Sequence, residues 1–178
     1  SGLMRQALTL ALAHTAQRAA FGKKLVEQPL MKNVLADLAL ESEAATALAL
    51  RLARTLDHPH DAHEVLMRRV LTPVAKFWIC KRGSHFGQEA MECLGGNGYV
   101  EEGPLARYYR EAPVNAIWEG SGNVMALDVL RVLGRAPALF EEVLAGIERD
   151  LGAHGRGTIG VLRAAIQVAE RDEGSARI

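Results

Sequence analysis

The sequence predicts an all-α protein, an up-down bundle of four to five long helices with a C-terminal helical extension. Alanine and leucine dominate the hydrophobic residues, which make up 49% of the 178-residue chain, whereas aromatic residues make up only 5%. This composition favours helices over strands. Apolar residues recur at helical spacing, and we find no stretch with the alternation of a strand of credible length. We expect the bundle to span residues 1–134 and the extension residues 135–178.

Composition limits the classes of protein to consider. The formal net charge is zero, so the whole chain has no attraction to nucleic acid or acidic membranes, although a local patch remains possible. No apolar run approaches the roughly 20 residues that span a bilayer. Two cysteines are too few for a disulfide framework and suit a reducing compartment, so we expect a cytoplasmic protein. Because the chain lacks an initiator methionine and ends abruptly, we expect it to be a piece of a longer protein.

The first two helices are expected over residues 3–17 and 29–57. Between them we expect the first helix to end at Gly22, with a glycine as its C-terminal cap. Arg18 and Phe21 are three residues apart and would share a face just before this turn. Arg18 is either a solvated cation at a helix end or an anion ligand, and the local sequence leaves both interpretations open.

A loop over residues 57–63 precedes a third helix over about 61–94. The loop holds three histidines and two aspartates, but their spacing matches no closed tetrahedral metal site. Pro59 and a helix-capping Asp61 explain the stretch as a connection between helices. Pro73 lies inside the third helix and should kink it or divide it in two.

The remaining elements are shorter. A Gly-Gly-Asn-Gly turn at 95–98 follows the third helix and can present backbone N–H groups to an anion or a flat ring, or it is simply a tight turn. A short helix is expected over 104–111. Residues 137–151 and 158–171 have helical patterns, separated by a flexible break at 152–157.

The most informative stretch places Glu119 between a tryptophan and two glycines. Gly120 and Gly122 let the backbone approach another group or adopt positive φ. Ser121 is a plausible N-cap of the helix that follows. The helix dipole would stabilise a charged Glu119, whereas desolvation against Trp118 would destabilise it. Glu119 is therefore either a general base or a solvated loop residue beside a cap.

Three motifs stand in a fixed order: Arg-x-x-Phe-Gly-Lys-x-Leu at 18–25, Leu-Gly-Gly-Asn-Gly-Tyr at 94–99 and Ile-Trp-Glu-Gly-Ser at 117–121. Together, on long alanine-rich helices, they closely resemble the C-terminal helical domain of the acyl-CoA dehydrogenase family, over about residues 1–134. The sequences at 89–99 and 110–123 resemble the AidB-like branch, which is associated with the adaptive response to alkylation damage.

This resemblance implies a larger enzyme of fatty acid metabolism with an N-terminal helical domain, a middle β domain and this bundle. It implies bound FAD, an acyl-CoA substrate, a homotetramer built as a dimer of dimers, and an electron-transferring flavoprotein as acceptor. Glu119 matches the glutamate that commonly removes the α-proton of the thioester. We expect the chain alone to be inactive, because the middle domain that should hold the flavin is absent.

The resemblance also assigns cofactor contacts. Arg18 matches an arginine that contacts the FAD pyrophosphate, usually of a neighbouring subunit, and Phe21 matches an aromatic residue beside it. The other matching positions are Gly95, Gly96, Ser121 and Asn123. Two residues depart from the pattern. Glu92 stands where many members carry a glutamine that contacts FAD, and Trp118 replaces a commoner tyrosine, which puts the acyl substrate in doubt.

The AidB-like resemblance gives an alternative function, a DNA-associated protective flavoprotein with weak or vestigial dehydrogenase activity. From Gly134 onward the chain has six arginines and seven acidic residues. Since phosphate binding normally needs a concentrated basic face, this tail argues against the alternative, and nucleic acid would bind only through the parent protein. A third interpretation is a structural bundle acting in tetramer assembly.

Overall fold

The computed structural model describes residues 1–172, apart from the side chains at 139 and 154, and 85% of these described residues are helical. The all-α prediction is confirmed. The chain forms two compact units. Unit 1 comprises Ser1–Arg51 and Ala75–Trp118, and unit 2 comprises Leu52–Val74 and the residues from Glu119 onward. No helix among the described residues is long and apolar enough to cross a membrane.

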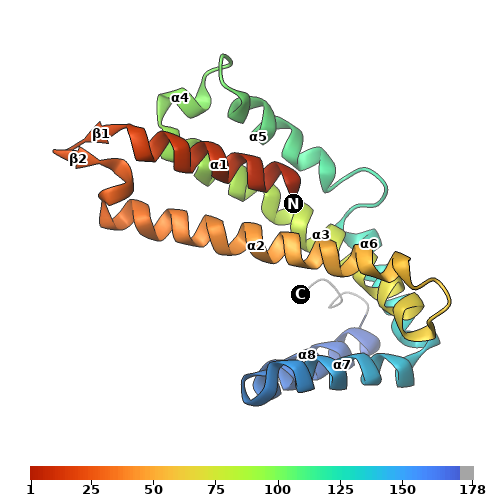
Figure 1. Cartoon of the computed structure of the whole chain (residues 1–178). Helices are drawn as coiled ribbons and strands as arrows, with labels where there is room; N and C mark the ends of the chain where they lie inside the picture. Colours follow the sequence, from red (N-terminus) through yellow and green to blue (C-terminus); the bar gives the residue numbers. More distant parts are fainter. Residues whose placement is uncertain (173–178) are drawn as a thin grey trace. The chain divides into compact units, whose positions relative to one another are not determined.

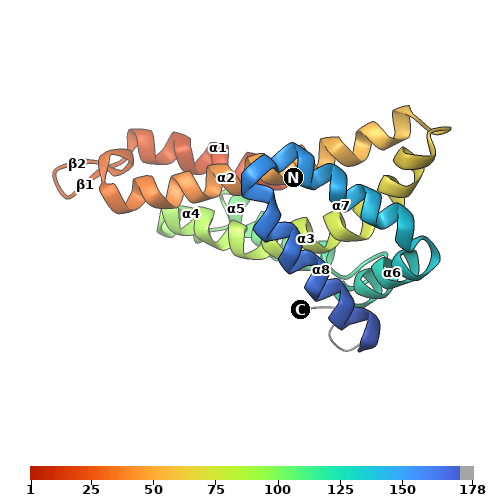
Figure 2. The same cartoon turned by 90° about the horizontal axis from the view of Figure 1, so that it is seen from below.

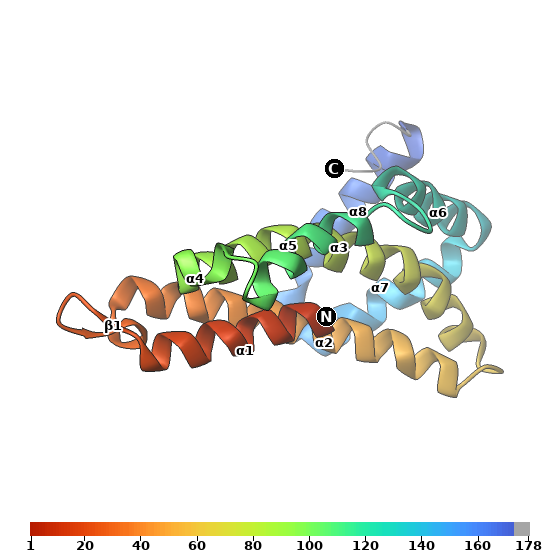
Figure 3. The same cartoon turned by 90° about the horizontal axis from the view of Figure 1, so that it is seen from above.

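Unit 1 is built around three long helices. Figures 1 to 3 show α1, the first part of α2 and the second part of α3 running along a common direction. The elements with residues in this unit are α1 (Gly2–Gln17), β1 (Ala19–Ala20), β2 (Lys23–Lys24), a 3-10 turn (Leu25–Glu27), α2 (Pro29–Asp57), α3 (Ala62–Leu94), α4 (Gly96–Tyr99) and α5 (Pro104–Asn115). Their core combines small and large apolar side chains, including Leu8, Ala11, Leu38, Phe86, Ala90 and Leu105. Buried alanines let the helices approach closely.

The segment after α1 differs from the prediction. The helix ends at Gln17, in agreement with the predicted range 3–17, but Gly22 is not its cap, because Arg18 is already extended, with φ −73° and ψ 126°. Two short strands pair antiparallel, and the two-residue turn between them is Phe21-Gly22, with φ 53° and 83°. Positive φ at both central residues characterises the hairpin turn that matches strand twist. Arg18 and Phe21 therefore do not share a helix face.

The loop before α3 is explained by its cap. The backbone N–H groups of His63 and Glu64 donate to Asp61 Oδ1 at 2.9 and 3.4 Å, as expected for a capping aspartate. α3 continues through Pro73, so the helix is not divided there. The boundary between the two units falls directly after Val74.

Two turns in unit 1 carry further corrections. The glycine turn is a short helix, α4, entered through Gly95 at φ 60°. A Cβ at Gly98 would lie 2.9 Å from the Met91 Cα, so glycine lets α4 pack on α3. α5 runs through Pro113 to Asn115, beyond the expected end at 111.

Unit 2 contains the first part of α3 with α6 (Gly122–Arg135), α7 (Pro137–Leu151), a 3-10 turn (Gly152–His154) and α8 (Gly155–Arg171). Its core contains Leu66, Met67, Val70 and Val143. The predicted break after residue 151 is present but shorter than 152–157, because α8 already begins at Gly155, where a Cβ would lie 2.6 Å from the Leu151 Cβ. Arg163 of α8 also pairs with Glu141 and Glu148 of α7, at 3.0 and 3.4 Å.

Candidate functional site

The Glu119 segment begins at the end of α5. The backbone N–H groups of Ile117 and Trp118 both donate to the Val114 carbonyl, at 2.9 and 3.1 Å, and close the last turn. Glu119 then adopts φ 57°, in the left-handed region, and Gly120 follows at φ 122°. Non-glycine residues in this region are uncommon. The backbone thus changes from the right-handed helical region to the left-handed region at Glu119.

The residues after Glu119 explain this reversal. A Cβ at Gly120 would lie 2.5 Å from Met125 Cε and 3.2 Å from Val124 Cγ1. Together with the φ of 122°, which L side chains rarely adopt, this close approach to α6 favours glycine, as the sequence predicted. Ser121 is the N-cap residue of α6, as predicted, but its side chain makes no capping hydrogen bond.

The surroundings of Glu119 are open in this chain. Glu119 is exposed, and Ile117 and Trp118 are 63% and 57% exposed. The apolar wall predicted beside the carboxylate is therefore present as two exposed side chains. A dry site would need further groups to cover them.

The other predicted residues lie in unit 1 and are also exposed. Arg18 is exposed at the end of α1, and Phe21, at the tip of the hairpin, is 95% exposed. Glu92 is exposed on α3, where Gln88 Nε2 donates to its Oε1 at 3.3 Å. A Cβ added at Gly95 or Gly96 would have no atom within 4 Å, so another molecule could approach this backbone.

The structure brings some of these residues together. The hairpin with Phe21 and the short helix α4 lie at the same end of unit 1, and α5 leads away from this end (Figures 1 and 3). Glu119, Ser121 and Asn123 belong to unit 2. The predicted site residues thus form one group at an end of unit 1 and a second group at the start of α6.

One property links the two groups. Among the described residues, Phe21 and Glu119 are the non-glycine residues with positive φ. Such conformations cost about 1–3 kcal/mol each and concentrate at functional sites. The same two residues were named from the sequence, Glu119 as a candidate base from its neighbours and Phe21 from the family resemblance.

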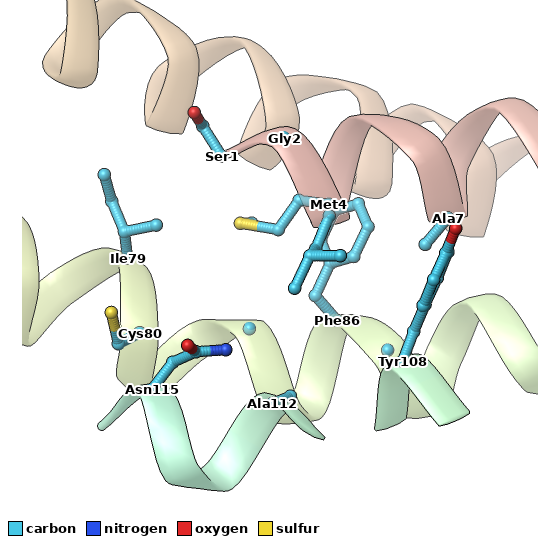
Figure 4. Close-up of a pocket in the computed structure, with 13 residues that line it drawn as sticks. Ser1, Gly2, Met4, Ala7, Ile79, Cys80, Phe86, Tyr108, Ala112 and Asn115 are labelled. Atoms are coloured by element: carbon cyan, nitrogen blue, oxygen red, sulfur yellow. The ribbon is translucent and has the colours of Figure 1, made fainter. Parts of the chain in front are cut away.

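An apolar pocket of about 400 Å³ lies in unit 1 between α1, α3 and α5. Figure 4 shows Met4, Ile79, Phe86 and Tyr108 around it, with the Asn115 side chain near Cys80. The sequence did not predict this pocket. Nor did it predict a hydrogen bond from Lys76 Nζ to the Asn115 carbonyl, at 3.3 Å. Neither has a local sequence pattern, because each depends on how helices pack.

Unit 2 contains a groove that the sequence also did not predict. It has a volume of about 640 Å³ and is lined by Arg68 and Arg69 of α3 and by Arg131 and Arg135 of α6. Asp128 also lines it and pairs with Arg131. The arginines come from segments about 60 residues apart, so a count along the chain could not show their clustering. Among the described residues, no group of histidine, cysteine or acidic side chains could hold a metal ion.

A family profile for the C-terminal domain of acyl-CoA dehydrogenases matches residues 1–134. The chain belongs to the acyl-CoA dehydrogenase family. It is 56% identical over 139 residues to the putative acyl-CoA dehydrogenase AidB of Escherichia coli, covering 78% of this chain and 26% of AidB. It is 36% identical over 155 residues to acyl-CoA dehydrogenase family member 11 of Caenorhabditis elegans, covering 85% of this chain and 25% of the relative.

Solved structures are also similar to this chain. Caenorhabditis elegans ACDH-11 in complex with C11-CoA superposes with a TM-score of 0.79 at 28% identity, covering 99% of this chain and 34% of that one. The apo form of Bd2924 gives a TM-score of 0.88 at 34% identity, covering 99% and 35%. The chain therefore spans about a quarter of the length of these curated relatives and a third of the length of these structures.

Members of the family are FAD-dependent, so the exposed residues can be tested against this cofactor. At one end of unit 1 an arginine guanidinium, an aromatic ring and open glycine backbone are all accessible. Guanidinium and backbone N–H groups suit pyrophosphate oxygens, and a ring suits a flat heterocycle. These exposed groups have the chemistry that contacts to such a cofactor need.

Proposed function

We propose that the chain is the C-terminal part of an FAD-dependent acyl-CoA dehydrogenase in which Glu119 is the base. The reaction is the α,β-dehydrogenation of an acyl-CoA thioester. The observation that supports this proposal most is the left-handed conformation of Glu119 before α6. A glycine would fit there without strain, so a retained glutamate points to a use for its carboxylate.

Glu119 would remove the proton from the carbon next to the thioester carbonyl. This proton is very weakly acidic, so the carboxylate must act where water is excluded. The exposed rings and methyl groups of Trp118 and Ile117 would supply part of that apolar cover once the rest of the parent protein packs on them. Oxidation at the β-carbon, by loss of a hydride equivalent, is the chemistry that bound FAD would supply.

The remaining candidates would hold the cofactor. Arg18 would donate hydrogen bonds to the pyrophosphate oxygens of FAD bound to a neighbouring subunit of a homotetramer. Phe21 would lie beside the same cofactor. Gly95 and Gly96 would admit the adenosine end, and Ser121 and Asn123 would contact the flavin. Glu92 accepts a hydrogen bond from Gln88, and we propose that it faces ribose hydroxyls of the cofactor. An electron-transferring flavoprotein is the proposed acceptor, in the cytoplasm.

The test is Glu119→Gln in the full-length parent protein, with flavin bleaching by acyl-CoA as the measurement. General-base catalysis contributes about 10²- to 10⁴-fold, so the rate of bleaching should fall by about that factor while FAD stays bound. Glu102→Gln, at an exposed carboxylate in unit 1, is the matched control and should bleach normally. Undiminished bleaching by Glu119→Gln would show that another group is the base.

We also propose that this chain alone is inactive, since it offers one edge of the FAD site. The expected result is no stoichiometric FAD in the purified chain and no turnover of acyl-CoA. Stoichiometric FAD together with turnover would contradict this proposal.

The arginine groove supports a second candidate function, a DNA-associated protective flavoprotein with weak dehydrogenase activity. Four arginines and a single aspartate line one groove, and this clustering of positive charge is what the tail lacks. In the full-length parent, Arg68→Gln should weaken DNA binding and reduce the salt slope by about 1. Arg149→Gln, at an exposed arginine of α7, is the control. No DNA binding at low salt would exclude this candidate.

A further inference from the structure

We propose that Lys76 is a positioning residue for Glu119. Its ammonium group would hold the C-terminal end of α5, from which the segment with the glutamate departs. The inference rests on the proposed role of Glu119 as the base, and it assigns Lys76 a role through the backbone, with no direct part in the chemistry.

The contact that carries the inference joins two distant helical segments. Lys76 Nζ donates to the Asn115 carbonyl at 3.3 Å, across 39 residues of sequence, and the bond is partly buried. The last carbonyls of a helix lack partners within the helix and carry partial negative charge. A lysine ammonium at this point satisfies the carbonyl and stabilises the helix end electrostatically.

Asn115 is held by more than this bond. Its Nδ2 donates to the Glu111 carbonyl at 3.2 Å. The Asn115 side chain also lines the apolar pocket of Figure 4, near Cys80 and Ala112. Side chain and carbonyl thus have separate restraints, and the lysine supplies the one that acts on the backbone.

The position of the bond in the chain explains why it matters for the base. Unit 1 resumes at Ala75 and ends at Trp118, so Lys76 and Asn115 lie close to the two ends of this segment. From Asn115 the chain makes one closed turn, with Trp118 bonded to the Val114 carbonyl, before Glu119. Only this short hydrogen-bonded turn separates the Asn115 carbonyl from Glu119. Loss of the hydrogen bond to the carbonyl should therefore let the Glu119 carboxylate move.

The test uses the full-length parent protein and compares three variants. Lys76→Met keeps an unbranched stem but removes the donors and the charge. The rate constant of flavin reduction by acyl-CoA should fall roughly 10- to 100-fold, since displacement by about 1 Å can cost 10²-fold. The KM should change little, because the interaction affects the reacting geometry and not substrate affinity. Lys76→Arg should retain most of the rate. Lys81→Met, at an exposed lysine of the same helix, should behave as wild type.

Amide hydrogen exchange of peptides covering residues 111–119 gives a second measurement. Exchange should be faster in Lys76→Met than in wild type and Lys76→Arg. If Lys76→Met does not fold, Lys76→Gln replaces it, because glutamine removes the charge and shortens the reach. Equal reduction rates and equal exchange in wild type and the uncharged variant would overturn the inference. Normal bleaching by Glu119→Gln would instead overturn the proposed base, so the two failures are distinguishable.

Discussion

Replacing Phe21 by asparagine should stabilise this chain. Phe21 and Gly22 occupy the two central positions of the hairpin turn, with φ 53° and 83°, and asparagine followed by glycine is the favoured pair in such turns. A left-handed conformation costs an ordinary L-residue about 1–2 kcal/mol. Because Phe21 is 95% exposed, the substitution removes almost no packing. We expect a gain of about 1 kcal/mol, which raises Tm by about 2–4 °C.

The assay is thermal unfolding of the chain followed by far-ultraviolet circular dichroism, with two controls. Phe21→Ala keeps a Cβ and therefore the strain, so its stability should stay within about 0.5 kcal/mol of wild type. Tyr99→Asn replaces a 76% exposed aromatic residue of α4 that has no positive φ, so it should bring no gain. If Phe21→Asn were no more stable than wild type while Phe21→Ala lost stability, the ring would be making stabilising contacts and the strain argument would be wrong.

The same substitution should have the opposite effect on the parent protein's cofactor. If Phe21 lies beside FAD, Phe21→Asn should lower the affinity for FAD while raising the stability of this chain. A titration of apoprotein with FAD measures the first effect. Unchanged affinity would remove the functional reason for keeping a strained phenylalanine.

Two further predictions concern unit 1. Gly98→Ala should destabilise the chain by about 2 kcal/mol, because the new Cβ would lie 2.9 and 3.0 Å from the Met91 Cα and carbonyl carbon. The control Gly96→Ala, with open space around its Cβ, should leave Tm unchanged or slightly raised. Equal Tm values for the two variants would contradict the close packing at Gly98. Burial raises the pKa of Cys93 to about 11, with Glu89 and Glu92 adding to it, so at pH 8 roughly one thiol in 10³ is the reactive thiolate. Cys80, at the pocket, should therefore react with iodoacetamide first. The reaction rate of Cys93 should rise about tenfold per pH unit toward pH 11. Equal reaction rates of the two cysteines at pH 8 would contradict the burial of Cys93.

Helix bounds were predictable where a proline starts a long amphipathic stretch. The predicted helices over 29–57 and 137–151 match α2 and α7, since proline suits the first turn and nothing interrupts either pattern. The end of α1 was not predictable in the same way. Phe21-Gly22 lacks the asparagine that marks a two-residue hairpin, so the glycine suggested a helix cap.

The motifs were enough to name the candidate site residues, but not to predict their geometry. The order of the three motifs identified Arg18, Phe21 and Glu119 without any coordinates. It could not show that two of these residues are strained, since no sequence pattern reliably indicates a positive φ at a non-glycine residue. The arginine groove and the Lys76 bond were missed for a different reason, because each joins helices far apart in the chain.

The two strained residues also indicate how the chain relates to the rest of its parent. Strain persists when surrounding structure over-determines a conformation. Around Phe21 a hairpin and a glycine do this, and around Glu119 the closed turn of α5 and the close approach of Gly120 to Met125 do so. Yet neither side chain gains much burial within the chain, because both are exposed. A cost in backbone conformation without a local gain in packing is best explained if both side chains make their contacts outside this chain, as the proposed cofactor edge and base require.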